Sequence, residues 1–193
     1  MSFVSKAAQI GALSLLALAP ARASLASVAP AGTTLYDSTG GTENGGDSFK
    51  SAGGILVDRI QTTTAETLLS VSLNLAKNNT RAGTFDVVLT RLGAGGKPVL
   101  RSVLATLSDA NLTSSFALVN VNVAGNVQLK ANTGYYIGIA HHPKVNSSVQ
   151  FGNTLDPRVL ARSSVVAGAS YYNNGGAQAN AGGPYEIQVV ATP

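Results

Sequence analysis

Apolar residues spaced two apart are the feature that most constrains this fold. Residues 66–77, ETLLSVSLNLAK, place Leu69, Val71, Leu73 and Leu75 on one side, with Ser70, Ser72 and Asn74 on the other. Successive side chains of a β-strand point to opposite faces, so this alternation predicts a strand with one buried and one wet face. Residues 83–92 repeat the pattern with Phe85, Val87 and Leu89. We expect the two segments to form an antiparallel pair.

Similar segments follow along the rest of the chain, separated by turn residues. We expect strands at 99–107, 116–123, 127–130, 134–141, 149–151, 165–172 and 185–191, and a short helical turn in SDANL at 108–112. The apolar face changes sides near Leu118, and a β-bulge there would accommodate the change. The glycine-rich residues 38–48 are expected to form a loop. About nine short antiparallel strands without a long helix predict an all-β fold, a single β-sandwich of jelly-roll type.

The first 23 residues have the composition of an export leader. A basic start and an apolar run at 7–19 precede Ala21-Arg22-Ala23, the small-x-small pattern at which signal peptidases cut. We therefore expect residues 1–23 to be a signal peptide, 24–32 a flexible lead-in and 33–193 the β-sandwich domain. The apolar run is shorter than the roughly 20 residues that a permanent anchor needs, so no transmembrane anchor is expected.

Charge and cysteine content exclude several classes of function. The chain has 13 basic and 9 acidic residues, and the basic residues are dispersed singly. A nucleic-acid-binding face needs them clustered, so nucleic acid is not an expected partner. The chain contains no cysteine, which removes thiolate metal sites and cysteine nucleophiles. Without disulfides, core packing must stabilise the exported fold.

Three segments carry a resemblance to a known family. They are LYDSTGG at 35–41, ATLSDANLTSS at 105–115 and LKANTGYYIGIAHH at 129–142. Together they resemble bacterial extracellular choice-of-anchor domains, most closely the R type, which are associated with PEP-CTERM sorting tails. The resemblance covers residues 33–191 and implies a surface or matrix component without assigned catalytic residues. Because the sequence ends at Pro193 without such a tail, we expect a product that is freely secreted or retained by partners.

Tyrosines next to amide residues indicate a glycan site. Exposed aromatic rings combine an apolar body with a polar tip and stack well on sugar rings. Adjacent strand residues face opposite sides, so at least one ring of Tyr171-Tyr172 is expected to face solvent. The predicted glycan-binding residues are Tyr171, Tyr172, Asn173, Asn174 and Tyr136, with Tyr185 as a further member. The alternative is that these rings pack in the core or at a sheet edge.

Metal-binding residues are few. Asp37, Glu43 and Asp47 lie in or beside the glycine-rich segment, and calcium prefers carboxylate and carbonyl oxygens. They form the predicted calcium site, the alternative being a solvated turn; no other cofactor is expected. His141 and His142 are the only histidines. As adjacent strand residues they should face opposite sides and should not bind one ion together.

The expected function follows from compartment and fold. We expect an exported, non-enzymatic bacterial protein with a structural or adhesive role, located at the cell surface, in the extracellular matrix or in the periplasm. Extracellular polysaccharide and other surface proteins are expected partners, and strands such as 119–123 predict self-association through sheet edges. A carbohydrate-binding module using exposed tyrosines is the first alternative. A secreted hydrolase is the second, although no G-x-S-x-G motif occurs.

Overall fold

The computed structural model describes residues 32–41, 43–49, 54–78, 83–96, 98–142, 147–154, 165–167, 171–173, 177–179 and 184–193. The predicted leader, and the lead-in up to residue 31, lie outside these ranges. The strands are β1 (Thr33–Asp37), β2 (Glu43–Ser48), β3 (Ile55–Thr62), β4 (Glu66–Lys77), β5 (Thr84–Leu92), β6 (Pro98–Ser108), β7 (Ala117–Leu129), β8 (Thr133–His141), β9 (Val149–Thr154), β10 (Val165–Ala167), β11 (Tyr171–Asn173), β12 (Ala177–Ala179) and β13 (Ile187–Thr192). Two short 3-10 helices are η1 (Ala94–Gly96) and η2 (Asp109–Asn111).

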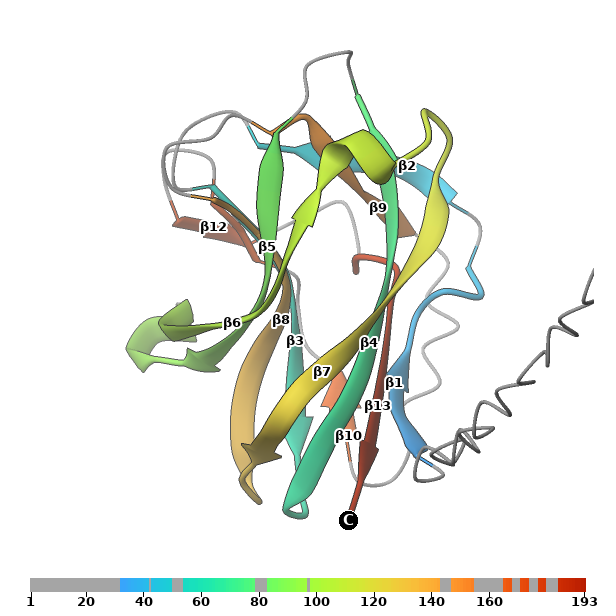
Figure 1. Cartoon of the computed structure of the whole chain (residues 1–193). Coiled ribbons are helices and arrows are strands. Elements are labelled where there is room, and N and C mark those ends of the chain that lie inside the picture. The colour runs from blue at the N-terminus through green and yellow to red at the C-terminus, as the bar shows by residue number, and fades with distance from the viewer. Residues whose placement is uncertain are drawn as a thin grey trace, which may run out of the picture.

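The strands form two curled antiparallel sheets that pack face to face (Figure 1). One sheet has the order β1-β13-β4-β7, and the other has the order β3-β8-β5-β6. Followed along the chain, these eight strands cross from one sheet to the other at every step except β5 to β6. That alternation is the topology of a jelly roll. The predicted all-β, jelly-roll-like sandwich is therefore confirmed.

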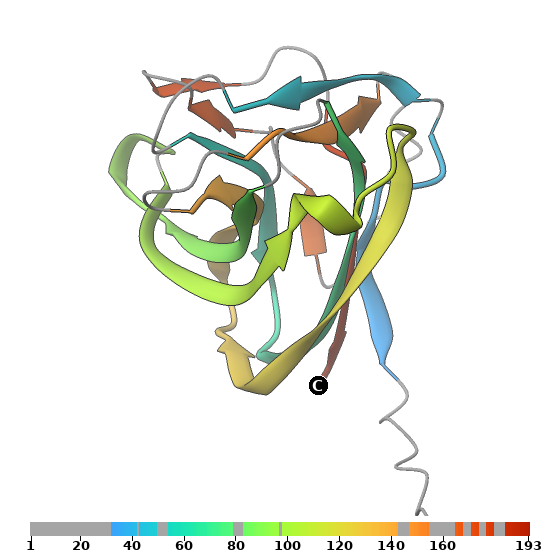
Figure 2. The same cartoon turned by 45° about the horizontal axis from the view of Figure 1, so that its top comes forward.

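Five further strands extend the two sheets. Beside β4, β9 and then β2 continue the first sheet, while β10, β11 and β12 widen the second next to β3. Figure 2 looks down on these additions from the end at which β2 and β9 lie. The described residues thus contain thirteen strands, more than the nine or so expected. The eight-residue β3 and the six-residue β2 were missed, and the strand expected at 165–172 falls on β10 and the start of β11. The two strands expected at 116–123 and 127–130 are one strand, β7.

Two predictions about the early strands were wrong. The segments 66–77 and 83–92 do not pair: β4 lies in one sheet, and β5 lies between β8 and β6 in the other. Alternation fixes which side chains are buried, but not which strand lies alongside. Residues 43–48 form β2, which pairs with β9, and not a loop. Its glycines fit because the Phe116 ring covers Gly46, where a Cβ would lie 2.5 Å from Phe116 Cζ.

The alternation is interrupted at different positions from those expected. Leu118 follows the regular pattern with its side chain 57% exposed, so no bulge is needed there. The register between β4 and β7 shifts further on, where Leu68 pairs with Val127 but Ser70 pairs with Asn122. This bulge also turns Leu69 outward and leaves Leu68 in the core. We predicted the bulge only from the change in which alternate positions are apolar. That pattern cannot show whether Leu118 is buried or exposed.

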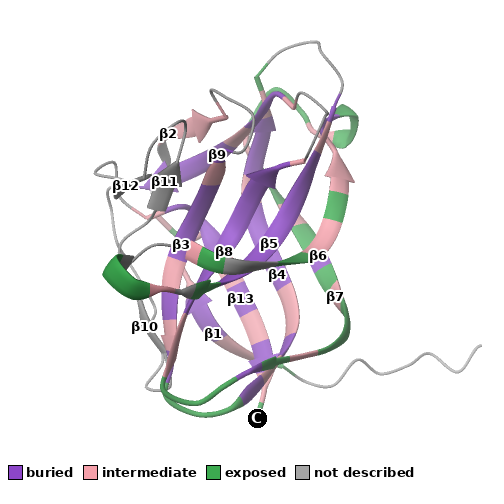
Figure 3. Ribbon diagram, turned by 90° about the vertical axis from the view of Figure 1, so that its left-hand side faces the viewer, coloured by how far each residue is buried: buried purple, intermediate pink, exposed green. Residues whose placement is uncertain are grey.

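The core lies between the inner faces of the two sheets. Figure 3 shows β5 and β8 almost wholly buried, whereas β6 and β7 have long exposed stretches. The largest fully buried side chains are Tyr36, Tyr185, Phe85, Phe151, Leu35, Leu56, Ile60, Leu68, Leu73, Leu75, Leu129 and Ile137. A second, small apolar cluster of Val57, Val88, Tyr136 and Ala140 lies on the opposite face of the β3-β8-β5 sheet. Both faces at the centre of this sheet are therefore buried.

Close approach of β3 and β8 requires a glycine at position 138. A Cβ there would lie 2.3 Å from the Leu56 carbonyl oxygen and 2.8 Å from Val57 Cα, and neither backbone atom can move without shifting the strand. We expect Gly138→Ala to lower the free energy of unfolding by about 3 kcal/mol, measured by urea denaturation. Gly40→Ala is the control, because nothing lies within 4 Å of its Cβ position. Equal stability of the two variants would contradict this packing.

Candidate functional site

The outer face of the six-stranded sheet presents many uncharged hydrogen-bonding side chains, with the apolar side chains of Leu69, Val190 and Leu118 among them. We call the polar set the amide face, and it consists of Thr67, Ser70, Ser72, Asn74, Asn120, Asn122, Gln128, Gln188 and Thr192. The core side chains of β4, β7 and β13 occupy the alternate positions, so these residues point away from the core. Asn120, Asn122 and Gln128 are exposed, and most of the others are half-buried. None of them carries a charge.

Strand register arranges the amide face in rows. Asn120 on β7 pairs with Ser72 on β4, and Ser72 pairs with Gln188 on β13. In the row at the lower end, Gln128 pairs with Thr67, and its amide nitrogen donates to the Thr67 hydroxyl at 2.8 Å. Neighbouring strands lie about 4.8 Å apart, so the Asn120-Ser72-Gln188 row repeats amide or hydroxyl groups at that interval. The next row, Asn122-Ser70-Val190, ends in an apolar side chain.

Two acidic residues lie at the margins of this face. The Gln188 amide donates to Asp37 Oδ2 at 2.8 Å, at the β1 side. At the upper end Asn74 Nδ2 donates to Glu186 Oε2, and Glu186 is 2% exposed. Both carboxylates accept hydrogen bonds from residues of the face. The exposed part of the face therefore offers neutral donors and acceptors.

Strand β7 also leaves backbone groups free at the edge of this sheet. The Asn74 N–H donates to the Glu186 carbonyl at 3.0 Å, so the backbone of Asn74 points away from β7. N–H and C=O directions alternate along an antiparallel strand, and Leu118 pairs with Asn74. Leu118, Asn120 and Asn122 therefore direct their backbone groups away from β4. Among the described strands, β7 pairs with β4 alone.

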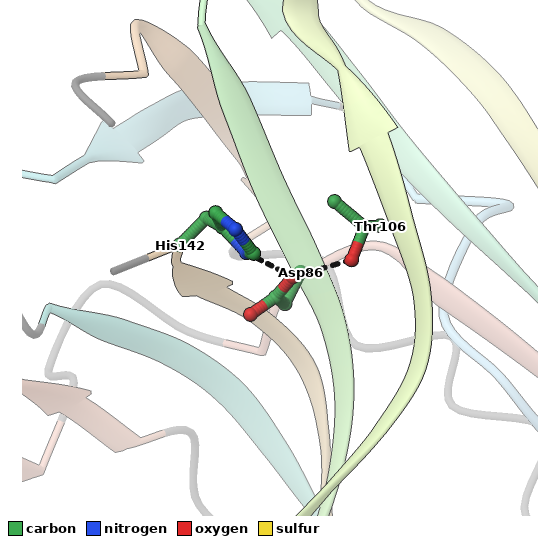
Figure 4. Close-up of polar contacts among 3 residues, drawn as sticks. All are labelled: Asp86, Thr106 and His142. Atoms are coloured by element: carbon green, nitrogen blue, oxygen red, sulfur yellow. Dashed lines mark hydrogen bonds and ion pairs between the residues drawn. The ribbon is translucent and has the colours of Figure 1, made fainter. Parts of the chain in front are cut away.

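A histidine and an aspartate form the second candidate site, on the far sheet (Figure 4). His142 Nδ1 lies 2.8 Å from Asp86 Oδ1, and the Thr106 hydroxyl donates to the same oxygen at 2.8 Å. Asp86 is 2% exposed. An ionised Asp86 favours the tautomer with hydrogen on Nδ1, which leaves Nε2 as an acceptor. This is the orientation of a general base.

The arrangement around His142 lacks the order of a hydrolytic triad. A triad needs a nucleophile at Nε2, on the side of the ring opposite the carboxylate. Thr106 instead contacts Asp86, on the other side of the carboxylate from the ring. Within the described residues, no hydroxyl bonds to the imidazole. The His141 side chain points to the opposite face and is 6% exposed. Its ring lies edge-on to the Phe49 ring, with 5.8 Å between the two ring centroids. The expectation that the two histidines face opposite sides is confirmed.

A fully buried carboxylate, Asp58, connects the two sheets. It lies on β3, and its Oδ2 accepts from the Tyr36 hydroxyl of β1 at 2.9 Å. Its Oδ1 accepts from the Tyr185 N–H at 3.2 Å, just before β13. Burial, and then the charge of Asp58, raise the pKa of the Tyr36 phenol well above its ordinary range. Tyr36 therefore keeps its proton and donates to Asp58.

Asp109 is a second buried carboxylate, and its hydrogen-bond donors lie in loops. It accepts from the backbone N–H groups of Gly83 at 2.6 Å and Ser148 at 3.0 Å, and it is fully buried. Glycosidase chemistry needs two carboxylates that face one substrate. Asp58 and Asp109 instead accept hydrogen bonds from backbone N–H groups and hydroxyls inside the fold, which assigns them a structural role.

The predicted glycan residues do not come together as a surface in the described chain. Tyr136 is 5% exposed and belongs to the small outer cluster with Val88, so it is no exposed platform. Tyr185 is fully buried and stacks on Phe151 at 4.5 Å. Tyr136 is buried because its outward-facing position on β8 is covered. Tyr185 is buried because the segment before β13 enters the core.

The remaining glycan residues are placed only by their backbone, or not at all. Tyr171 pairs with Val57 and Tyr172 with Leu56, and Asn173 ends β11. The side chains of these three residues, and the whole of Asn174, lie outside the described part of the structure. A role for them in glycan binding stays a prediction.

Two of the predicted calcium ligands are engaged with protein groups. Asp37 Oδ1 accepts from the Thr39 N–H at 2.9 Å, and Asp47 Oδ2 accepts from the Tyr185 hydroxyl at 2.8 Å. The Glu43 side chain lies outside the described part. Where the structure describes side chains, no group of three His, Asp or Glu residues could hold a metal ion. Calcium binding stays a prediction that these contacts do not favour.

Comparisons with known proteins add little to this geometry. No protein-family model matches the chain, and no curated protein sequence matches it. Among solved structures, it is similar to a chain in the "Structure of infectious bursal disease virus Gx strain", with 11% identity and a TM-score of 0.35. The match covers 94% of this chain and 45% of the viral chain, so this chain spans less than half of that one. The class of protein, a jelly-roll sandwich, rests on strand order.

Within the described ranges, no helix is long and apolar enough to cross a membrane.

Removal of the Tyr36 hydroxyl tests the buried link between the sheets. Tyr36→Phe removes one hydrogen bond to the buried Asp58 carboxylate, and we expect it to lower the free energy of unfolding by about 1.5–3 kcal/mol at pH 7. The unfolded chain releases this phenolic proton near pH 10, whereas the folded chain keeps it. Wild-type stability should therefore fall relative to the variant above about pH 10, by at most about 1.4 kcal/mol per pH unit.

Urea denaturation between pH 7 and 11 measures both effects. Tyr135→Phe is the matched control, because the Tyr135 hydroxyl accepts only from a backbone group, the Lys130 N–H at 2.8 Å. We expect that change to cost about 1 kcal/mol or less. A stability difference between wild type and Tyr36→Phe that stays constant up to pH 11 would show that Tyr36 ionises freely in the fold.

Proposed function

We propose that this protein is exported and acts as a non-enzymatic structural or adhesive component of the bacterial cell surface or extracellular matrix. The observation that carries the proposal is the amide face, a sheet surface of exposed and half-buried amides and hydroxyls without a charge. The leader-like composition of residues 1–23 supports export.

The chemistry of the amide face fits a neutral, hydroxyl-rich polymer. Amides and hydroxyls both donate and accept, so they match the hydroxyl groups of a polysaccharide. Neither side carries ions that must be desolvated, a step that is costly when pairing is incomplete. Regular rows allow the same contact to repeat along an extended chain. Binding of this kind should depend little on ionic strength, since screening acts on charges.

A carbohydrate-binding module that uses Tyr171 and Tyr172 is the alternative. It shares the ligand class but places the contact on β11, in the other sheet. The two hypotheses therefore differ in the face that binds, and substitutions separate them.

Export predicts a defined first residue. When the chain is expressed in a bacterium with its own leader, we expect mass spectrometry of the exported product to show Ser24 at the N-terminus. Cutting after Ala23 follows the small-x-small rule. Recovery of only the uncut chain, in the cytoplasm, would contradict export.

Retention on an insoluble neutral polysaccharide tests the adhesive role. We expect the exported chain to sediment with cellulose at both 0.05 and roughly 0.5 M sodium chloride, because the contact is uncharged. The double variant Ser70→Glu, Thr192→Glu places two carboxylates on the amide face, and we expect it to bind at least about tenfold more weakly, because each buried charge must be desolvated.

The control adds the same charge elsewhere. Ser102→Glu, Ala110→Glu alters exposed positions on β6 and η2 and should bind like wild type. Binding that is equal in all three proteins, or that disappears at the higher salt concentration, would refute a neutral contact at the amide face. Loss of binding in Tyr171→Ala, Tyr172→Ala alone would favour the β11 alternative.

A further inference from the structure

Free sheet edges in this fold differ in how they are protected against pairing. Natural edges are commonly blocked by proline, charge, bulges or short length. Strand β6 carries Pro98, and its register with β5 shifts twice. Strand β1 carries Asp37 and a shift between Thr34 and Tyr36. At the far edge of the seven-stranded sheet, β12 has only three residues.

Strand β7 has none of these features over its first half. Its sequence, ALVNVNVAGNVQL, contains neither a charge nor a proline. Leu118, Asn120 and Asn122 direct their backbone groups away from β4, and all three residues are exposed. The bulge lies beyond them, near Gly125 with its φ of +84°. The segment from Ala117 to Val123 is therefore a regular, open edge.

We propose that this edge pairs with the same edge of a second copy of the chain, antiparallel, about a two-fold axis at Asn120. A two-fold contact brings each surface against itself, so the edge must be self-complementary. Asn120 then faces Asn120 of the second copy, and Leu118 faces Asn122. The pairing residues are those whose N–H and C=O groups are free, so each can bond to the opposite strand.

The composition of the edge favours a second copy over a charged partner. Like charges directly opposite each other destabilise a strand pair, and a neutral segment avoids this when it meets itself. A basic or acidic partner would find no opposite charge on β7. Leu118, 57% exposed in the single chain, would be covered in part by the second copy. The amide faces of the two copies would then form one continuous surface.

This inference rests on the proposed structural role, because it names a second copy of the chain as the partner in assembly. Its test does not depend on that role. Sedimentation equilibrium of the exported chain should show a dimer. Asn120→Lys and Asn120→Asp each place like charges directly opposite across the axis, and we expect each to weaken dimerisation at least about fivefold. Mixing the two variants in equal amounts should restore the dimer, because Lys then faces Asp.

Gln128→Lys is the control, with the same added charge on the same strand and face but beyond the bulge. It should dimerise like wild type, and circular dichroism should show that all variants fold. A monomeric wild type at millimolar concentration, an Asn120→Lys variant that dimerises normally, or a mixture that stays monomeric would each overturn the inference. A dimer that fails to bind cellulose would refute the adhesive role alone, and a cellulose-binding monomer would refute the β7 pairing alone.

Discussion

The contact between the two sheets depends on a carboxylate buried between them. Asp58 is fully buried on β3, and it accepts hydrogen bonds from Tyr36 on β1 and from the Tyr185 backbone before β13. Removing one partner from a buried charge costs more than the net gain from making the bond, so such a group favours one arrangement of its donors. In a chain without cysteine, this link fixes the lateral position of one sheet on the other.

Tyr185 adds further contacts to this link at one end of the sandwich. Its hydroxyl donates to Asp47, its ring stacks on Phe151, and its carbonyl accepts from the Ser38 hydroxyl at 2.6 Å. Strands β1, β2, β3 and β9 are thereby joined through one side chain and its backbone. The consequence for function is indirect. The polar groups that specify the fold are inside, and the amide face on the outside of the six-stranded sheet carries neutral groups.

The sequence predicted the fold class well because alternation reports burial directly. The inner positions Phe85, Val87 and Leu89 and the outward direction of Ser70 and Ser72 both follow from a period of two, although Ser72 is buried. Strand neighbours could not be predicted, since pairing depends on crossovers that periodicity does not record. For this reason β4 and β5 were expected to pair, and β3, with Asp58 among its inward residues, was missed.

The candidate site was recognisable only in pieces. The polar positions of 66–77 were visible in the sequence, but their alignment with Asn120 and Gln188 requires the register of three strands distant in the chain. Tyr136 was expected at the surface because it faces away from the core, yet that face of β8 is buried as well. Glycan binding by Tyr171 and Tyr172 and calcium binding by Glu43 are unaffected by this, because those side chains lie outside the described residues.

One sheet both closes the core and exposes a regular, pairing-competent edge on β7. Amide hydrogen exchange along β7, resolved by NMR at low and high protein concentration, tests it most directly. At low concentration the N–H groups of Val119 and Val121, bonded to β4, should exchange slowly, and those of Leu118, Asn120 and Asn122 rapidly. At high concentration the second set should also become slow. Uniform protection at all concentrations, or a fast second set at high concentration, would contradict the account.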